Sequence, residues 1–309
     1  METNHPDGIG TRDFLFYNEL CSIYQTTPVI IKMMKYFFAS FTDFIKFDRK
    51  PNEDFYLISE KLPIFVIADG VTQSHFPSGE YAFPAGARMA AQIFCYTTLG
   101  FLEAKLNSQD KKSESLIEKA FDLANQRIRE LNIVEGIDKK LNFLEYDWFD
   151  TVGIAGFIIK DKIFYGFVGD CGLAIFDRNN KLKFQTKDMV APVEERAKKI
   201  YKNWKNLPLR KRRLIMRKDF RNNPSGKGYG SFTGEKGVKK YYKISHKNLE
   251  PKDLIVFYSD GFLNYFQFPE FIEILRKQDK KALDDFTFQK AKENYQRYGT
   301  DRTLIAIIF

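Results

Sequence analysis

Hydrophobic and polar positions along this chain follow two different rhythms. Short runs rich in aromatic and β-branched residues, which are typical of strands, cover residues 42–47, 55–59, 62–68, 151–159, 162–168 and 173–176. A turn at residues 177–180 predicts a hairpin into a strand at 181–184, and two more strands are expected after Lys252 and at the C-terminus. Apolar residues at helical spacing predict helices over residues 79–106, 113–133, 268–277 and 280–297.

The order of these elements favours one fold class. Strands come first, then two helices, then strands, then helices, and such segregation is typical of an antiparallel, layered α+β fold. No internal repeat and no long Gly/Ser/Pro linker divides the chain, which favours a single main domain over residues 41–309. Residues 1–40 are interpreted as an extension of uncertain role, which could add an edge strand or a helix.

Composition narrows the class of protein. Of 309 residues, 44% are hydrophobic, which is enough for a sizeable core. The cysteines Cys21, Cys95 and Cys171 form no CxxC pair, which argues against a disulfide framework or a thiolate zinc site and suits a reducing compartment. The polar N-terminus lacks the pattern of a signal peptide, and no window of 18 apolar residues occurs. We therefore expect a soluble, cytoplasmic protein without a membrane partner.

The formal net charge of +9 comes mainly from one segment. Residues 196–221 hold twelve Lys/Arg residues and one acid, Asp219. This stretch is expected to be helical up to about residue 219, and a glycine-rich loop follows at residues 221–237. The favoured interpretation is a solvated helix face that docks on the core through Ile200, Trp204, Leu207 and Leu214.

Two functional alternatives for the basic segment stay open. The charges could steer phosphorylated or acidic protein partners towards the molecule. Nucleic acid is the least favoured partner and is considered because Tyr201 and Trp204 are interleaved with lysines.

Candidate chemistry lies at the ends of the predicted strands. Asp69, Asp170 and Asp260 each follow an apolar strand, and Asp301 precedes the last one. A single Asp-Gly is a common turn, but several in one chain suggest carboxylates that converge on hard cations. Oxygen ligands select Mg²⁺ or Mn²⁺ over zinc, and the carbonyl of Gly70 could approach such an ion closely.

The strand ends are part of a longer series of motifs. Arg49 is followed five residues later by Asp54, and the other segments are residues 65–70, 150–153, 168–171, 184–188 and 259–261. In this order and spacing the chain, from about residue 48 to residue 309, resembles the type 2C, metal-dependent protein serine/threonine phosphatases, and its bacterial members in particular. The resemblance implies an α-β-β-α layered sandwich of two antiparallel sheets flanked by helices, with a basic flap insert at about residues 189–237.

The resemblance also implies roles for single residues. Asp69 would bridge two Mn²⁺ or Mg²⁺ ions beside the Gly70 carbonyl, Asp260 would hold one ion, and Asp170 would help to bind a possible third. Asp54 would bind the other ion or orient its waters, and Arg49 would grip the substrate phosphate with its fork of donors. The last ligand is expected to be Asp301, although the motif's spacing from Thr303 leads to Thr300 and Asp301 falls one place late.

The implied activity is hydrolysis of phosphoserine or phosphothreonine on proteins by a metal-bridging hydroxide. Phosphorylated proteins would be the substrates, and a serine/threonine kinase would be the counterpart. Val71 stands where some members have a histidine, which leaves protonation of the leaving group to a metal-bound water. The rival hypothesis is a pseudophosphatase that binds phosphoproteins without turnover, suggested by the Thr300 placement and by Thr72 and Gln73 in place of a glycine pair.

Overall fold

The structure is a computed structural model that describes residues 35–41, 52–74, 76–107 and 113–309. Arg49 and the strand predicted over residues 42–47 lie outside this part of the chain. The described residues belong to one compact unit.

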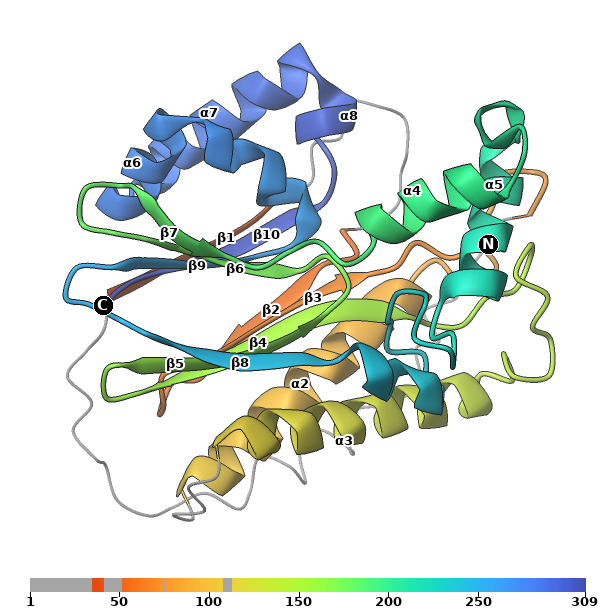
Figure 1. Cartoon of the computed structure of the whole chain (residues 1–309), viewed down its shortest axis with the longest axis horizontal. Coiled ribbons are helices and arrows are strands. Elements are labelled where there is room, and N and C mark those ends of the chain that lie inside the picture. Colours follow the sequence, from red (N-terminus) through yellow and green to blue (C-terminus); the bar gives the residue numbers. More distant parts are fainter. Residues whose placement is uncertain (1–34, 42–51, 75, 108–112) are drawn as a thin grey trace, which may run out of the picture. The chain divides into compact units, whose positions relative to one another are not determined.

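The first sheet has five antiparallel strands among the described residues, in the order β2-β3-β4-β5-β8. These are β2 (Phe55–Ile58), β3 (Ile64–Gly70), β4 (Thr151–Ile159), β5 (Lys162–Val168) and β8 (Lys243–Asn248). Two long helices, α2 (Gly86–Asn107) and α3 (Ser113–Val134), cover the outer face of this sheet (Figure 1).

The second sheet has the order β1-β10-β9-β6-β7. Its strands are β1 (Lys35–Phe41), β10 (Arg302–Ile308), β9 (Leu254–Tyr258), β6 (Gly172–Phe176) and β7 (Leu182–Gln185). Its outer face packs against a 3₁₀ helix, η4 (Asp260–Gln267), and against α6 (Pro269–Lys277), α7 (Lys280–Glu293) and α8 (Tyr295–Tyr298). Helices therefore lie outside both sheets (Figure 1), and the predicted α-β-β-α sandwich is confirmed.

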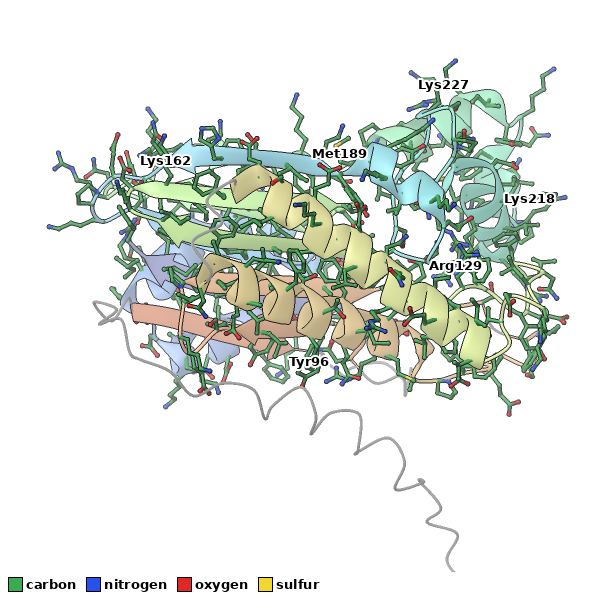
Figure 2. All side chains as sticks on the ribbon, turned by 90° about the horizontal axis from the view of Figure 1, so that it is seen from below. Tyr96, Arg129, Lys162, Met189, Lys218 and Lys227 are labelled. Atoms are coloured by element: carbon green, nitrogen blue, oxygen red, sulfur yellow. The ribbon has the colours of Figure 1, made fainter. Side chains whose placement is uncertain are left out.

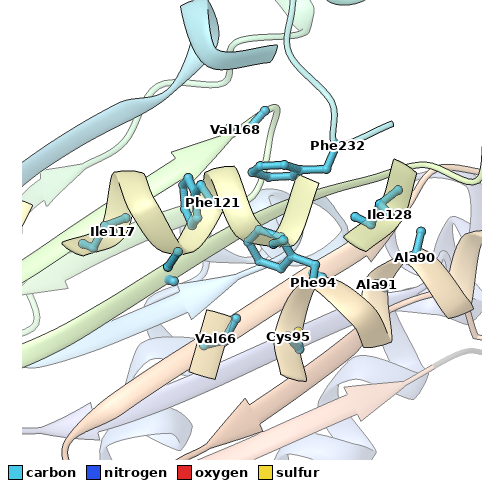
Figure 3. Close-up of a cluster of buried hydrophobic side chains, with 14 of the residues drawn as sticks. Val66, Ala90, Ala91, Phe94, Cys95, Ile117, Phe121, Ile128, Val168 and Phe232 are labelled. Atoms are coloured by element: carbon cyan, nitrogen blue, oxygen red, sulfur yellow. The ribbon is translucent and has the colours of Figure 1, made fainter. Parts of the chain in front are cut away.

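The sandwich follows from the two-residue period of its strands. In β3, Ile64 and Val66 face the helices, whereas Phe65 and Ile67 face the other sheet, where Phe65 meets Phe257 at 5.7 Å between ring centroids. Figure 3 shows the helix-side core, in which aromatic side chains from α2, α3 and the loop after the basic segment pack together: Phe94, Phe121 and Phe232.

Three elements differ from the sequence-based expectation. The helix predicted from residue 79 begins at Gly86, after Pro84, since proline favours a position before or in the first turn. Strand β8 was not predicted, because its sequence is largely polar and only one of its faces meets the core. Strand β1 pairs antiparallel with β10, from Lys35 opposite Ile308 to Phe41 opposite Arg302, at the edge of its sheet. It is an edge strand of the kind that residues 1–40 could add, but it extends one residue past the boundary drawn between residues 40 and 41.

The basic segment forms a helical unit with a small core of its own. It contains α4 (Ala191–Ile200), a 3₁₀ turn η1 (Trp204–Asn206), α5 (Leu209–Ile215) and a π-helical turn η2 (Met216–Phe220), and a further 3₁₀ helix η3 (Lys236–Tyr241) follows the glycine-rich loop. Trp204 is buried in this core, as expected, but Ile200 is 57% exposed, because it is the last residue of α4 and extends beyond the cluster. Among the described residues, the helices are all too short or too polar to span a bilayer.

Candidate functional site

One end of the sandwich collects the strand ends that carry the acidic residues. Because neighbouring strands run antiparallel, the ends of β3, β5, β7 and β9 lie beside the beginnings of β2, β4, β6 and β10. The carboxylates there influence one another's ionisation, which places their charges close together. They are Asp54, Asp69, Asp170, Asp188, Asp260 and Asp301.

Asp54 joins the two sheets. It is buried just before β2, and its Oδ2 accepts a hydrogen bond of 2.7 Å from Ser259 Oγ, which follows β9. Ser259 Oγ also accepts a hydrogen bond of 2.8 Å from the backbone N–H of Thr303 in β10. Burial raises the pKa of Asp54 to about 7, and the charges of Asp301 and Asp260 act in the same direction, whereas the hydrogen bond from Ser259 opposes them.

Asp69 and Gly70 end β3 in the middle of the cluster. Thr151 Oγ1 donates a hydrogen bond of 2.7 Å to the Asp69 carbonyl and fixes the backbone there. Burial raises the pKa of Asp69 well above its ordinary range, and the neighbouring carboxylates add to the shift. A Cβ at Gly70 would lie 2.7 Å from backbone atoms of Ala87 and 2.8 Å from the Glu53 carbonyl, so only glycine fits at this position.

Asp260 lies beside Asp69, and its charge adds to the rise that burial causes in the pKa of Asp69. Two like charges this close favour the neutral form of one carboxyl group unless a cation is bound beside them. Asp260 is exposed as a residue, but desolvation of its carboxyl group by the surrounding protein raises its pKa.

Asp170 lies between β5 and β6. Burial raises its pKa well above the usual range, and the charges of Asp260 and Asp188 raise it further. Asp188 is the last residue of the motif segment 184–188, and the sequence analysis assigned it no role. Its Oδ1 accepts hydrogen bonds from the backbone N–H groups of Val190 and Ala191, at 2.7 and 3.0 Å, so it ties the start of the basic segment to the acidic end of the sandwich.

Asp301 and Thr300, the two positions considered for the last ligand, have different surroundings in the structure. Asp301 Oδ2 accepts a hydrogen bond of 3.1 Å from the backbone N–H of Glu53, and its charge acts on Asp54 and Asp260. Thr300 is exposed, and its carbonyl accepts a hydrogen bond of 3.1 Å from Arg302. Asp301, and not Thr300, therefore belongs to the acidic cluster.

The donor set fits hard divalent cations. It consists of carboxylate and carbonyl oxygens, and Asp54 Oδ1 is buried without a hydrogen-bond partner among the described residues. In the same part of the chain, no three His, Cys, Asp or Glu side chains already stand as a ready-made ligand group. The individual ligand roles of Asp54, Asp69, Asp170, Asp260 and Asp301 therefore stay predictions, as does the role of Arg49.

A buried ion-pair network beside the cluster was not predicted. Arg221 donates to Asp147 Oδ1 at 2.7 Å and to Asp150 Oδ2 at 2.8 Å, and Arg217 Nε lies 2.8 Å from Asp147 Oδ2. We call these four residues the buried quartet; each is less than 10% exposed. Two arginines of the basic segment thus lie inside the protein. Only the proximity of residues distant in sequence defines this network, so no local pattern could have revealed it.

The quartet holds the loop that follows β3. Arg217 donates to the Thr72 carbonyl at 2.7 Å and also hydrogen-bonds to Ser74 Oγ, while Gln73 donates to the Asp147 carbonyl at 3.1 Å. The positions where the resembled family has a glycine pair are therefore fixed by side chains of the basic segment and of the loop before β4.

Comparisons with known proteins give a fold but no sequence family. The scan against protein-family models finds no match, and no curated protein is matched by sequence. A bacterial serine phosphatase has a TM-score of 0.58 at 15% identity, covering 89% of this chain and 98% of the other. The S. agalactiae serine/threonine phosphatase has a TM-score of 0.57 at 19% identity, covering 89% and 99%. The catalytic domain of the serine/threonine phosphatase PstP, solved in complex with 2 manganese ions, has a TM-score of 0.55 at 14% identity, covering 89% and 97%. The chain therefore has the fold of the bacterial metal-dependent serine/threonine phosphatases.

Proposed function

We propose that this protein is a metal-dependent phosphatase that hydrolyses phosphoserine or phosphothreonine on proteins. The observation that carries the proposal is the acidic cluster, in which Asp54, Asp69, Asp260 and Asp301 converge from both sheets at one end of this fold. Such a concentration of negative charge is costly unless cations balance it. Two Mn²⁺ or Mg²⁺ ions, with a third near Asp170, would balance it here.

Each residue has a role in this proposal. Asp69 and the Gly70 carbonyl would hold both ions, Asp260 and Asp301 would complete the ligands, and Asp54 would keep its free Oδ1 for the second ion or its waters. When bound, the ions would lower the pKa of a water molecule to make the nucleophile and would neutralise phosphate oxygens. Arg49 would bind the phosphate. Ser259 would orient Asp54 through the 2.7 Å hydrogen bond.

The described residues of the cluster favour attack by water over a cysteine phosphoenzyme. Cys171 lies within the cluster, but burial raises the pKa of its thiol well above the usual value, and Asp69 and Asp170 add to the shift. The proposal therefore assigns direct attack by water. Phosphorylated proteins would be the substrates, and a serine/threonine kinase would supply them.

The test is hydrolysis of p-nitrophenyl phosphate with Mn²⁺, with Mg²⁺ and with EDTA. Asp69→Asn and Asp301→Asn are each expected to lose at least 100-fold in kcat, about 2.7 kcal/mol in barrier height, and Thr300→Ala is expected to retain activity. Thermal unfolding with and without Mn²⁺ measures ion binding separately, since an ion that binds only the folded state must raise Tm. A rise in Tm without turnover would favour the phosphoprotein-binding rival. The absence of both turnover and a rise in Tm would refute a metal site.

A further inference from the structure

The loop that follows β3 contacts both the basic segment and the acidic end of the sandwich. The Val71 backbone N–H donates a hydrogen bond of 3.0 Å to the Asp150 carbonyl, and Arg217 donates one of 2.7 Å to the Thr72 carbonyl. Thr72 Oγ1 in turn donates a hydrogen bond of 2.6 Å to Glu53 Oε2. Thr72 therefore connects the buried quartet, through its backbone, with the segment before β2, through its side chain.

Figure 2 shows at which end of the molecule this connection lies. Lys218, the residue after Arg217, lies at the end of the domain opposite Lys162, which begins β5. Strand β5 leads away from Lys162 towards Asp170, so the basic segment lies at the same end as the acidic cluster. A contact that joins the two can therefore affect the geometry of the candidate metal site.

The hydroxyl of Thr72 makes a contact that glycine could not make. The resembled family has a glycine pair at positions 72 and 73, and glycine has no side chain that could donate a hydrogen bond. At 2.6 Å, the bond from Thr72 to Glu53 lies in the short range of hydrogen bonds from a hydroxyl to an ionised carboxylate, which are about twice as strong as neutral ones. Glu53 is buried, so solvent weakens this bond little.

Glu53 contacts two groups of the proposed metal site through its backbone. Its N–H donates a hydrogen bond of 3.1 Å to Asp301 Oδ2. Its carbonyl oxygen packs closely against Gly70, where an added Cβ would lie only 2.8 Å away from it. A shift of the Glu53 backbone would therefore disturb both Asp301 and Gly70.

Arg217 holds the loop from the side of the basic segment. Its Nε lies 2.8 Å from Asp147 Oδ2, and the same guanidinium group donates to Ser74 Oγ and to the Thr72 carbonyl. The planar fork of a guanidinium group makes such contacts in one fixed geometry. Since the charge of Arg217 is paired with Asp147, its role towards the loop is to set the position of Thr72.

We propose that Thr72 is a positioning residue of the metal site: together with Arg217 it fixes Glu53, and through Glu53 it fixes Asp301. The proposal rests on the proposed function and deepens it, because it makes the basic segment part of the support of a metal ligand. Outer-shell partners of this kind orient the ligands of a metal ion and strengthen its binding. Coupling between two sites is reciprocal, so bound ions would in turn hold the loop and the basic segment in place.

The test measures Mn²⁺ affinity by isothermal titration calorimetry of the full-length protein, and stability by urea unfolding in EDTA. Thr72→Val keeps the shape of the side chain but removes the donor to Glu53, and it is expected to weaken Mn²⁺ binding about tenfold. Thr72→Ser keeps the hydroxyl and should bind Mn²⁺ within about twofold of the wild type. The matched control is Ser74→Ala, which removes a nearby hydroxyl that donates to the Phe143 carbonyl instead of to Glu53, and it should preserve the affinity.

Arg217→Lys tests the contribution of the basic segment, because lysine keeps a positive charge for Asp147 but loses the fork that reaches the Thr72 carbonyl. This variant should weaken Mn²⁺ binding about threefold or more in the wild-type background. It should add less than about twofold to the effect of Thr72→Val, since residues that act through one contact are not additive. Additive effects would show that Arg217 acts by another route and would overturn its part in the proposal.

The outcomes separate the positioning role from the phosphatase function. Mn²⁺ binding by the wild type with unchanged affinity in Thr72→Val, or with an equal loss in Ser74→Ala, overturns the positioning role alone. A loss of urea stability in Thr72→Val without a loss of Mn²⁺ affinity shows a purely structural contact and overturns it too. Weaker Mn²⁺ binding confined to the Thr72→Val and Arg217→Lys variants, with no hydrolysis of p-nitrophenyl phosphate by the wild type, supports the positioning role and refutes the phosphatase. Absence of Mn²⁺ binding in the wild type overturns both.

Discussion

Replacement of Arg221 by methionine should destabilise the domain strongly and in a pH-dependent way. Arg221 is buried and donates to both carboxylates of the quartet, at 2.7 Å to Asp147 and 2.8 Å to Asp150. Methionine keeps much of the side-chain volume but removes the charge. Breaking a buried ion pair by removing one partner costs about 3–5 kcal/mol, because the remaining charge is left uncompensated. At about 2–4 °C per kcal/mol for a domain of this size, Tm should fall by about 6–20 °C.

The pH dependence follows from Asp150. In the wild-type protein, burial raises its pKa from 3.8 to about 7, against the opposing charge of Arg221. A carboxyl group with a raised folded-state pKa binds more protons folded than unfolded, so stability falls as the pH rises through that window. Without Arg221 the pKa rises further and the window extends above pH 7. The loss caused by Arg221→Met should therefore be smaller at pH 5 than at pH 8, since Asp150 can be protonated at pH 5.

Urea unfolding in EDTA, at pH 5 and pH 8, measures both effects. Arg127→Met is the matched control, because Arg127 pairs with Glu130 at 2.7 Å on the exposed surface of α3, where such a pair contributes about 0.2–1 kcal/mol. The double variant with Asp150→Asn should recover part of the loss at pH 8. A loss no larger than that of the control, or one equal at both pH values, would refute the reasoning.

Three further predictions concern the core and the site. The ring of Phe232 is fully buried and its centroid lies 4.6 Å from that of Phe94, so Phe232→Ala should lower the free energy of unfolding in urea by about 3–5 kcal/mol. A loss near 1 kcal/mol would mean that the loop moves in to fill the space left by the ring. Gly70→Ala should lower Tm and abolish Mn²⁺-dependent turnover because its Cβ meets backbone at 2.7 Å, whereas Gly100→Ala, in open space on α2, should raise stability by about 0.5–1 kcal/mol. Asp69→Asn should lose the Mn²⁺-induced rise in Tm, and calorimetry that still shows tight Mn²⁺ binding would remove Asp69 from the ligands.

The sandwich could be predicted because its inner strands carry strong patterns. Strands such as β4 and β9 are buried along nearly their whole length, and their sequences are correspondingly apolar. Strand β8 gave little signal, because none of its residues is fully buried and its exposed positions are polar: Lys243, His246 and Asn248. An edge strand with polar residues is difficult to distinguish from a loop until its partner is known.

The site could be predicted where an acidic residue lies at or directly after the end of an apolar strand, as Asp69 and Asp260 do. At the last ligand the sequence favoured Asp301, but it could not exclude Thr300. A shift of one residue at the entry of a strand reverses the direction of every side chain, and local sequence does not determine that register. Only the hydrogen bond from the Glu53 backbone to Asp301, across 248 positions of the chain, distinguishes the two.

The acidic cluster and the buried quartet show two ways to bury carboxylates, and the contrast bears on function. In the quartet, Arg217 and Arg221 balance Asp147 and Asp150, so the ion pairs persist without any added group. In the cluster, Asp54, Asp69, Asp170 and Asp260 have no basic side chain within ion-pair distance among the described residues.

A protein that needed these acids only for folding would gain stability by replacing them with apolar residues. The quartet shows how the described part of the chain neutralises buried carboxylates with its own arginines. For the cluster we propose counter-charges from outside the chain. In the proposed function, divalent cations would provide that balance by binding the carboxylates, and the substrate phosphate would complete the charge around the cations.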